Sequence, residues 1–323
     1  MAQHHNTVCH EPLPCCDGEA AVGSAPRNGP RIGHGSGFCT RLAATMSDLL
    51  FAPFHGRRGE AGNTAYRREG RGSAVLFIHG VGLNGSIWFP QIEAFAKRHT
   101  VIAMDIFGHG RSTMPPPEPS LSDYADQVEQ LRISLEIPGW HVVGHSMGAL
   151  IALEYALLHP ETALSISALN AVFQRTPEQR AAVEQRAASL RLDRHNPKVH
   201  RQAIGRWFGN PPPSHLQAVA SLARNLLDVV DPAGYAAAYH LFAGSDRAHS
   251  TRLAGLVPPA LFFTGALDPN STPAMSEAMA RLAPRGQFAV LDAERHMMAL
   301  TAPAEVNDQL LTFIGEAERS PRG

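Results

Sequence analysis

A serine lies at the centre of the stretch with the clearest chemical potential in this sequence. From Trp140 the chain reads Trp-His-Val-Val-Gly-His-Ser-Met-Gly, and helix-forming residues follow. A short apolar run, a glycine-flanked turn and a helix in this order are typical of a nucleophile elbow with Ser146 at its apex. Gly144 and Gly148 suit that turn, because a Cβ atom at either position would collide where strand and helix approach each other. The pattern predicts that Ser146 is presented as a nucleophile.

A serine hydroxyl becomes a good nucleophile only when a base takes its proton. The chain has 17 histidines, so position in the fold must select the base. His296 follows the last expected strand, in a loop that should face Ser146, and we assign it as the base. His145 is adjacent to the serine but should point away from it, because neighbouring side chains diverge in a tight turn. His79 and His109 lie in nearby loops, where we expect them to hold hydrogen bonds.

The base needs a third group that fixes its tautomer and stabilises its charge. Asp268 follows a strand within a Gly-Ala-Leu-Asp-Pro turn, between the serine and His296 in the chain. The order serine, aspartate, histidine is typical of elbow-containing hydrolases. Asp292 and Glu294 are too close to His296 in sequence to be preferred, and Asn170 stands where an acid could follow the preceding strand. We assign Asp268 as the orienting acid, with a turn-capping role as the alternative.

Two preorganised backbone amides are needed to hold the oxyanion that forms when a serine attacks a carbonyl carbon. The amide of Met147, directly after the nucleophile, is one candidate. We expect the amide of Val81 to be the second, because it lies in the loop after the first buried strand. Gly80 and Gly82 would let this backbone approach a ligand closely, and we assign Gly82 to substrate binding.

These groups require a scaffold, and the hydrophobic pattern predicts an α/β fold with a mostly parallel, twisted sheet flanked by helices. Apolar runs predict strands at residues 73–78, 100–104, 140–143, 163–169, 259–264 and 288–291. Helical spacing predicts helices at residues 86–98, 121–135, from 149 onward, 273–282 and 303–314. One or two edge strands are expected within residues 51–71. Because binding sites form at the carboxyl ends of parallel strands, the loops that carry the candidate groups should meet.

The alternation of strands and helices stops between residues 172 and 250, which we interpret as an inserted helical cap between two core segments, residues 46–171 and 251–318. Residues 172–210 carry eight basic residues against three acidic ones. This excess fits a solvated helix surface. It also fits arginines that turn inward and bind a substrate carboxylate bidentately. Trp207 and Tyr239 are candidate substrate-binding residues in the pocket wall.

The first 45 residues differ from the rest, since they are rich in Gly, Pro and His and lack apolar periodicity. All four cysteines lie here, at spacings that match no familiar zinc site, and we expect a disordered extension. Met46 is a candidate for the true start of the protein. The cysteine-free remainder suits a reducing cytoplasm. A net charge of -1 and the lack of a long apolar run favour neither nucleic-acid nor membrane partners.

With these residues in place, the chain resembles the α/β-hydrolase superfamily, specifically the capped esterases, lactonases and ring-cleavage-product hydrolases. The resemblance covers roughly residues 60–315 and rests on five segments, residues 79–82, 105–112, 144–148, 265–268 and His296. Two departures concern the substrate. Phe107 stands where the family commonly has proline, and we assign it to substrate binding. Met297 and Met298 stand where enzymes that cleave carbon–carbon bonds often carry tryptophan.

The resemblance implies a serine hydrolase that cleaves an ester, lactone or amide of a small metabolite through an acyl-enzyme. No metal or organic cofactor is expected. Hydrolysis of a carbon–carbon bond in a ring-cleavage product and perhydrolysis are alternatives within the same class. A receptor-like protein that binds a ligand and turns it over slowly is the alternative from another class. The sequence leaves a homodimer open.

Overall fold

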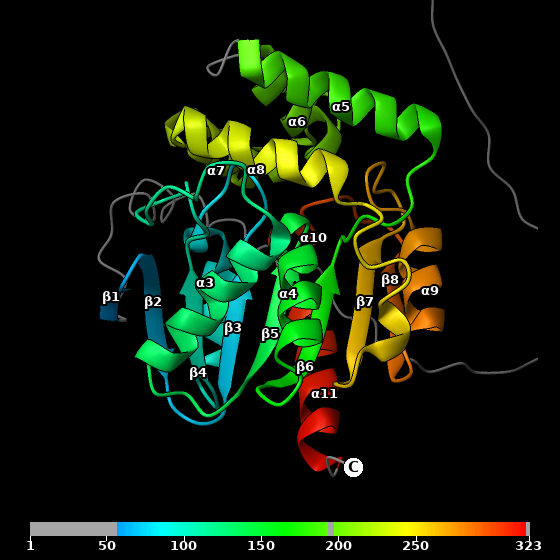
Figure 1. Ribbon diagram of the computed structural model, residues 1–323. Helices are drawn as coiled ribbons and strands as arrows, with labels where there is room; N and C mark the ends of the chain where they lie inside the picture. The colour runs from blue at the N-terminus through cyan, green and yellow to red at the C-terminus, as the bar shows by residue number, and fades with distance from the viewer. Residues whose placement is uncertain (1–56, 193–196, 321–323) are drawn as a thin grey trace, which may run out of the picture.

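The computed structural model describes residues 57–192 and 197–320. The expected N-terminal extension, the candidate start at Met46 and all four cysteines lie outside the described residues. An eight-stranded sheet forms the centre of the molecule, in the order β1-β2-β4-β3-β5-β6-β7-β8 (Figure 1). The strands are β1 (Arg57–Ala61), β2 (Thr64–Gly70), β3 (Ala74–Ile78), β4 (Thr100–Met104), β5 (Trp140–His145), β6 (Ala163–Leu169), β7 (Ala260–Gly265) and β8 (Gly286–Leu291).

Strand direction follows the expectation from the apolar runs. β3 to β8 pair in parallel, and every residue of β3, β4, β5 and β7 is buried. Continuous apolar runs suit such strands, because helices cover both faces of a parallel sheet. β1 and β2 pair antiparallel at the edge, where β2 is partly exposed, which confirms the expected edge strands. The carboxyl ends of the parallel strands therefore share one edge of the sheet.

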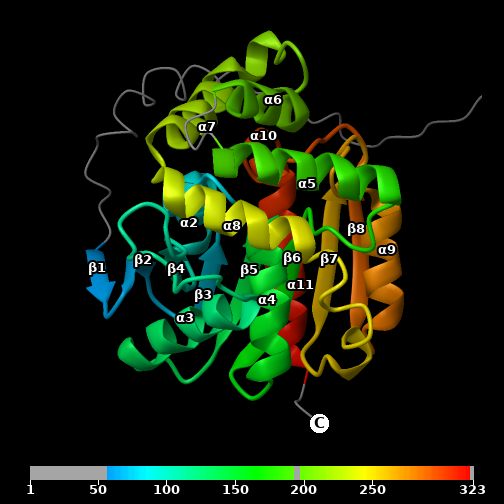
Figure 2. The ribbon, with the colours of Figure 1, turned by 45° about the horizontal axis from the view of Figure 1, so that its top comes forward.

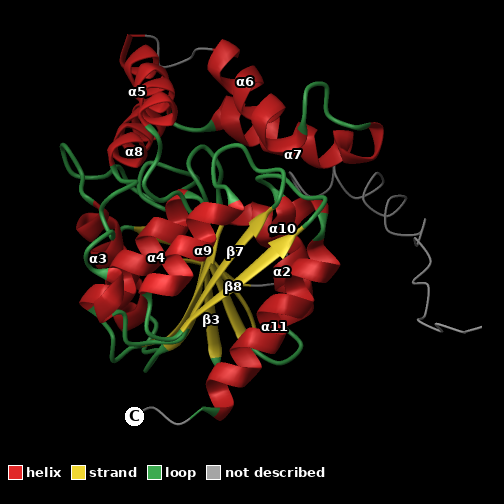
Figure 3. Cartoon of the chain, turned by 90° about the vertical axis from the view of Figure 1, so that its right-hand side faces the viewer, coloured by secondary structure: helices red, strands yellow, loops and turns green. Residues whose placement is uncertain are grey.

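Helices cover both faces of the sheet (Figure 3). One face carries α3 (Leu121–Ser134), α4 (Met147–Leu158) and α9 (Pro273–Leu282), and the other carries α2 (Phe89–Phe95), α10 (Met298–Thr301) and α11 (Pro303–Arg319). Ser120 and Asp123 form a capping box that begins α3, with the Ser120 amide 2.7 Å from the Asp123 carboxylate. Ten residues of α4 are buried, which places this helix in the core directly behind Ser146.

The boundaries differ from the expectation mainly at two helices. The closing helix, expected over residues 303–314, extends to Arg319. The sequence predicts a single helix over residues 86–98, whereas the structure has the 3₁₀ helix η1 (Gly85–Trp88) followed by α2. Pro90 lies in the first turn of α2, where its missing amide hydrogen costs no intrahelical bond, so it begins a new helix. The four-residue α10, which follows His296 closely, was not expected from the periodicity.

Four helices inserted between β6 and β7 lie above the carboxyl ends of the strands (Figures 1 and 2). They are α5 (Pro177–Leu192), α6 (Pro197–Phe208), α7 (Gln217–Val229) and α8 (Pro232–Gly244). The short helix η2 (Ser214–Leu216) lies between α6 and α7, and η3 (Leu253–Gly255) lies between α8 and β7. α5 packs against α8, and α6 packs against α7. This layer lies where the sequence predicts a helical cap, and we refer to it as the cap. Its role as a cap and its boundaries at residues 172 and 250 stay predictions.

A buried carboxylate ties the segment after the cap to the core. Glu154 of α4 accepts hydrogen bonds from His249 Nε2 at 3.0 Å, Arg252 Nη1 at 2.7 Å and Ser122 Oγ at 3.1 Å. Burial alone would raise the pKa of Glu154, but the bonds from His249 and Arg252 outweigh it and lower the pKa to about 2. The ionised carboxylate therefore anchors the cap exit to the helix that begins at the elbow. None of the described helices combines the length and apolar character needed to cross a bilayer.

Candidate active site

The turn that carries Ser146 is strained in the way that its glycines predict. Ser146 has φ 56° and ψ −116°, an unusual conformation for a residue with a side chain, and its amide donates to Leu169 O at 2.8 Å. A Cβ atom on Gly144 would lie 2.1 Å from Gly148 O, and one on Gly148 would lie 2.3 Å from Ile78 O. Only glycine fits at these two positions, which confirms the steric role expected from the sequence.

The loops after β7 and β8 bring Asp268 and His296 together. His296 Nδ1 donates to Asp268 Oδ2 at 2.7 Å, and both side chains are buried. This bond leaves Nε2 of His296 as the ring atom that can accept a proton. Burial tends to raise the pKa of Asp268, but the charge and hydrogen bond of His296, together with bonds from Asn270 and Asn170, hold it below its ordinary value.

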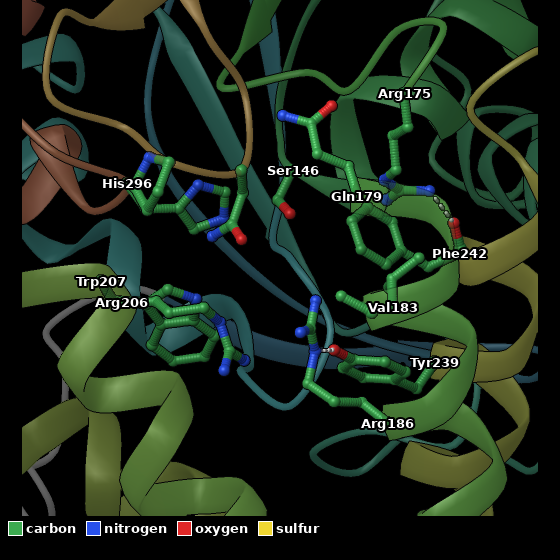
Figure 4. Close-up of a pocket in the computed structure, with 13 residues that line it drawn as sticks. Ser146, Arg175, Gln179, Val183, Arg186, Arg206, Trp207, Tyr239, Phe242 and His296 are labelled. Atoms are coloured by element: carbon green, nitrogen blue, oxygen red, sulfur yellow. Dashed lines mark hydrogen bonds between the residues drawn. The ribbon is translucent and has the colours of Figure 1, made fainter. Parts of the chain in front are cut away.

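Ser146 and His296 line one pocket between the core and the cap (Figure 4). They reach it from different strands, since Ser146 follows β5 and His296 follows β8. Asp268 contacts the histidine through the bond from its Nδ1. The structure therefore places a hydroxyl and an imidazole on one pocket and bonds the imidazole to a carboxylate, although the three residues are far apart in the chain. In this arrangement an imidazole can move a proton while a carboxylate fixes its orientation.

Two further residues hold Asp268 and His296 in place, and neither was expected from the sequence to do so. Asn170 Nδ2 donates to Asp268 Oδ2 at 2.9 Å, so the amide occupies the place where an acid was considered. His145 Nε2 donates to the backbone oxygen of His296 at 2.7 Å, and the two rings lie 4.8 Å apart. Burial, then the charge of His296, lowers the pKa of His145 to about 3. A neutral His145 thus holds the backbone of His296 in place.

The two amides expected to form the oxyanion hole lie close to the nucleophile in the fold. Met147 is the first residue of α4, where backbone amides have no intrahelical acceptor. Val81 follows Gly80, whose Cβ position would be 3.1 Å from Ser146 Cβ, so this loop runs directly beside the serine. The amide of Gly82 is already used, since it donates to His109 Nε2 at 2.9 Å. The role of the Val81 and Met147 amides in binding an oxyanion stays a prediction.

His79 and His109 hold the surrounding loops, as the sequence predicted. His79 Nδ1 donates to Gly80 O at 2.8 Å and its Nε2 accepts from the Ile106 amide at 3.0 Å. His109 Nδ1 donates to Phe107 O at 3.0 Å. Burial lowers the pKa of His79 to about 4 and that of His109 to about 3. Each ring is therefore neutral and locked in one tautomer, because protonation would destroy the acceptor that a backbone amide needs.

The pocket beside Ser146 has a volume of about 190 Å³ and is lined by residues of both the core and the cap. Trp207 and Tyr239, two of the four residues expected to bind substrate, line it. The structure places the other two elsewhere. Phe107 packs against Tyr124, with ring centroids 5.8 Å apart, and it lines a different hollow. Gly82 lies under the cap, where an added Cβ would be 2.4 Å from Leu227 Cδ2.

Three arginines line the pocket, and one of them is committed to structure. Arg175 lies over the Phe242 ring, 4.6 Å from its centroid, and its Nη1 donates to carbonyl oxygens at the end of α8 at 3.3 and 3.1 Å. The same nitrogen lies 3.6 Å from Asp246 Oδ1. Burial lowers the pKa of Arg175 to about 10, so the guanidinium stays charged near neutral pH. The guanidinium of Arg175 is therefore used to cap the end of α8 and is not assigned to ligand binding.

The other two arginines face the cavity without a carboxylate partner among the described residues. Arg186 Nε donates to the hydroxyl of Tyr239 at 2.9 Å, which fixes its direction. Burial, followed by repulsion from Arg186, lowers the pKa of Arg206, although Tyr239 offsets part of the shift. Figure 4 shows Arg186 and Arg206 pointing into the pocket from two different cap helices. An anion bound between them would satisfy both charges. The described residues contain no cluster of three or more potential metal ligands.

Comparison with known proteins gives consistent matches. The family profile described as alpha/beta hydrolase fold matches residues 73–303. A relative from Acinetobacter baylyi, (E)-2-((N-methylformamido)methylene)succinate hydrolase, is 37% identical over 253 residues, covering 77% of this chain and 93% of the relative. The solved structure of the enol-lactonase from Burkholderia xenovorans has a TM-score of 0.72 at 22% identity, covering 80% of this chain and 100% of that chain. A thermophilic esterase from Thermogutta terrifontis has a TM-score of 0.72 at 23% identity, covering 81% and 99%. The two structural likenesses establish the fold.

Proposed function

Because the chain belongs to the alpha/beta hydrolase fold family, we propose that it is a serine hydrolase acting through Ser146, His296 and Asp268. The observation that carries this proposal is the bond from His296 Nδ1 to Asp268 Oδ2 at 2.7 Å, with Ser146 on the same pocket as the imidazole. The substrate is an ester, lactone or amide. No step requires a metal or an organic cofactor.

In the proposed reaction, Ser146 Oγ attacks the carbonyl carbon of the substrate while His296 Nε2 takes the hydroxyl proton. Asp268 stabilises the imidazolium, and the amides of Val81 and Met147 donate to the oxyanion. The imidazolium then gives its proton to the leaving oxygen or nitrogen as the carbonyl–leaving-group bond breaks. A water molecule, deprotonated by His296, attacks the acyl-enzyme and releases the acid and the serine.

We propose further that the substrate carries at least one carboxylate. Arg186 and Arg206 support this, because both line the pocket and neither has a carboxylate partner among the described residues. A guanidinium binds a carboxylate bidentately, with specificity that a lysine lacks. The relative from Acinetobacter baylyi, named for hydrolysis of a substituted methylenesuccinate, acts on a molecule of this chemical class. Hydrolysis of the formamide bond of such a dicarboxylate is the first reaction to test.

The experiment compares (E)-2-((N-methylformamido)methylene)succinate with its dimethyl ester as substrates. We expect Arg206→Gln to raise KM for the dicarboxylate by about 10- to 100-fold, since a hydrogen bond to a charged group contributes roughly 1.5–3 kcal/mol. The rate at which the formamide bond of the neutral dimethyl ester is hydrolysed should change little. Arg201→Gln is the matched control, because Arg201 is exposed on the same helix.

An equal loss for the charged and the neutral substrate would contradict carboxylate recognition by Arg206. Turnover of a keto-acid ring-cleavage product without turnover of any ester, lactone or amide would favour the carbon–carbon hydrolase instead. Tight binding of a carboxylate ligand with negligible turnover would favour a receptor-like protein.

A further inference from the structure

The ring of a cap residue lies over the imidazole of the proposed base. Trp207 of α6 stacks on His296 with ring centroids 6.1 Å apart and an angle of 23° between the planes. Trp207 is only 9% exposed, so its neighbours hold the indole, which lines the pocket. On another side of the imidazole lies the ring of His145, at 4.8 Å. The imidazole of His296 therefore has two aromatic rings as neighbours in addition to its bond to Asp268.

We propose that Trp207 is a positioning residue for His296, holding the imidazole against Asp268 and stabilising the imidazolium that forms during proton transfer. This proposal rests on the proposed function, since it assigns His296 as the base. An indole face carries partial negative charge and attracts a cation stacked on it. The attraction is weak while the imidazole is neutral and appears when it becomes charged. It therefore favours the transition state over the resting enzyme.

The contribution of Trp207 can be distinguished from the contributions of the other groups around His296. Asp268 favours the imidazolium through its carboxylate, whereas the pocket guanidiniums of Arg186 and Arg206 disfavour it. His145 is neutral and contacts the backbone oxygen of His296 rather than a ring nitrogen. Trp207 is an uncharged group that can stabilise the imidazolium without competing for its protons. It comes directly after Arg206, so one helix turn of the cap supplies both a cation for the substrate and a ring for the base (Figure 4).

The test follows phosphonylation of Ser146 by a fluorophosphonate probe, because this reaction needs the serine and its base but no natural substrate. The rate is measured as a function of pH for wild type, Trp207→Leu and Trp207→Phe, with Ser146→Ala as the blank. Leucine keeps an apolar side chain without a π face, whereas phenylalanine keeps the face. Phe208→Leu is the matched control, because Phe208 is the next aromatic residue on α6 and lies outside the pocket lining.

We expect Trp207→Leu to slow the plateau rate by about three- to tenfold, the range that a cation–π contact supports. Loss of the imidazolium's partner lets the neutral base persist to lower pH. The acid limb of the profile should therefore move down by about half a pH unit. Trp207→Phe should restore most of the rate and the position of the limb. Phe208→Leu should leave the limb in place.

Identical profiles for wild type and Trp207→Leu would overturn the proposal while leaving the serine mechanism intact. Equal slowing in the leucine and phenylalanine variants, with an unshifted acid limb, would reduce Trp207 to a packing residue and would also overturn it. Failure of wild type to be labelled at Ser146 would remove the base itself, and both proposals with it. Circular dichroism melts of each variant verify that the compared proteins are folded.

Discussion

Three donors converge on the carboxylate of Asp268, and together they prevent it from rotating. His296 Nδ1 and Asn170 Nδ2 both reach Oδ2, at 2.7 and 2.9 Å, while the Asn270 amide reaches Oδ1 at 2.8 Å. A carboxylate held in this way can accept from only one tautomer of the imidazole. Its lowered pKa keeps it ionised near neutral pH, so it remains an acceptor there.

Replacement of Asp268 by asparagine tests this arrangement at the residue scale. We expect Asp268→Asn to lower kcat by about 10⁴-fold, because the amide can stabilise the wrong tautomer of His296 and carries no charge. Asp292→Asn is the matched control, since Asp292 is exposed in the loop that leads to the histidine. Steady-state kinetics on the same substrate measures both. A large loss in the Asp292 variant with little effect at Asp268 would reverse the assignment.

At the scale of elements, the elbow depends on the close approach of β5, α4 and the end of β3. The Cβ positions of Gly144 and Gly148 fall on backbone atoms, which cannot move aside as a flexible side chain could. The gain from this crowding is that Ser146 reaches the pocket. The strained φ of 56° at Ser146 is sustained by the buried elements on either side.

A methyl group at the crossing should therefore be costly. We expect Gly148→Ala to destabilise the protein by roughly 1–3 kcal/mol or more, the usual cost of overpacking, because its Cβ would lie 2.3 Å from Ile78 O. Gly244→Ala is the control, since a Cβ at the end of α8 would meet nothing within 4 Å. Alanine there should be neutral or slightly stabilising. Urea unfolding measures both, and equal stability of the two variants would contradict the steric account.

At the scale of the whole molecule, the sheet and its site-bearing loops were predictable, because the signal is local. Continuous apolar runs mark strands buried on both faces, and each ends in a polar loop at the same edge of the sheet. Asp268 and His296 followed from this rule and from their order in the chain. The elbow followed from the Gly-His-Ser-Met-Gly turn between an apolar run and a helix, and the cap followed from the end of the strand and helix alternation. The family resemblance added the class of reaction, and the comparisons confirm the family.

The residues of the pocket wall could not be predicted from local sequence patterns, because the wall depends on how the cap helices pack on the core. Helical spacing puts residues on a common face without saying which face turns toward Ser146. Arg206 and Trp207 turn toward it, whereas Phe107, an unusual residue in its motif, packs against Tyr124 of α3. Asn170 follows a strand at a position where we considered a site residue, so its position indicated a place in the site. Its side-chain amide did not indicate that it would contact the carboxylate of Asp268.

Three buried, neutral histidines should make stability depend on pH. The pKa values of His79, His109 and His145 are lowered to about 4, about 3 and about 3. An unfolded histidine titrates near 6.5, so below that pH the unfolded chain binds protons that the folded chain refuses. Each group therefore contributes stability above about pH 6.5 that is lost as the pH falls toward its folded value, at up to about 1.4 kcal/mol per pH unit.

We expect the free energy of unfolding to fall steadily between pH 6.5 and 4.5, as measured by urea titration at fixed ionic strength. His109→Asn should be less stable at pH 7 but should show a shallower decline on acidification. His240→Asn, at an exposed position on α8, should keep the wild-type slope. A flat profile across this range would contradict the burial of neutral histidines around the site.

Every step of the proposed hydrolysis depends on Ser146. The decisive measurement is turnover of a panel of short-chain nitrophenyl esters, lactones and amides, together with the methylenesuccinate formamide, by wild type and by Ser146→Ala. We predict that wild type hydrolyses at least one of them and that the variant loses about a thousandfold or more of this activity while keeping its thermal stability. Equal activity in the two proteins would remove Ser146 as the nucleophile, and the proposed mechanism with it.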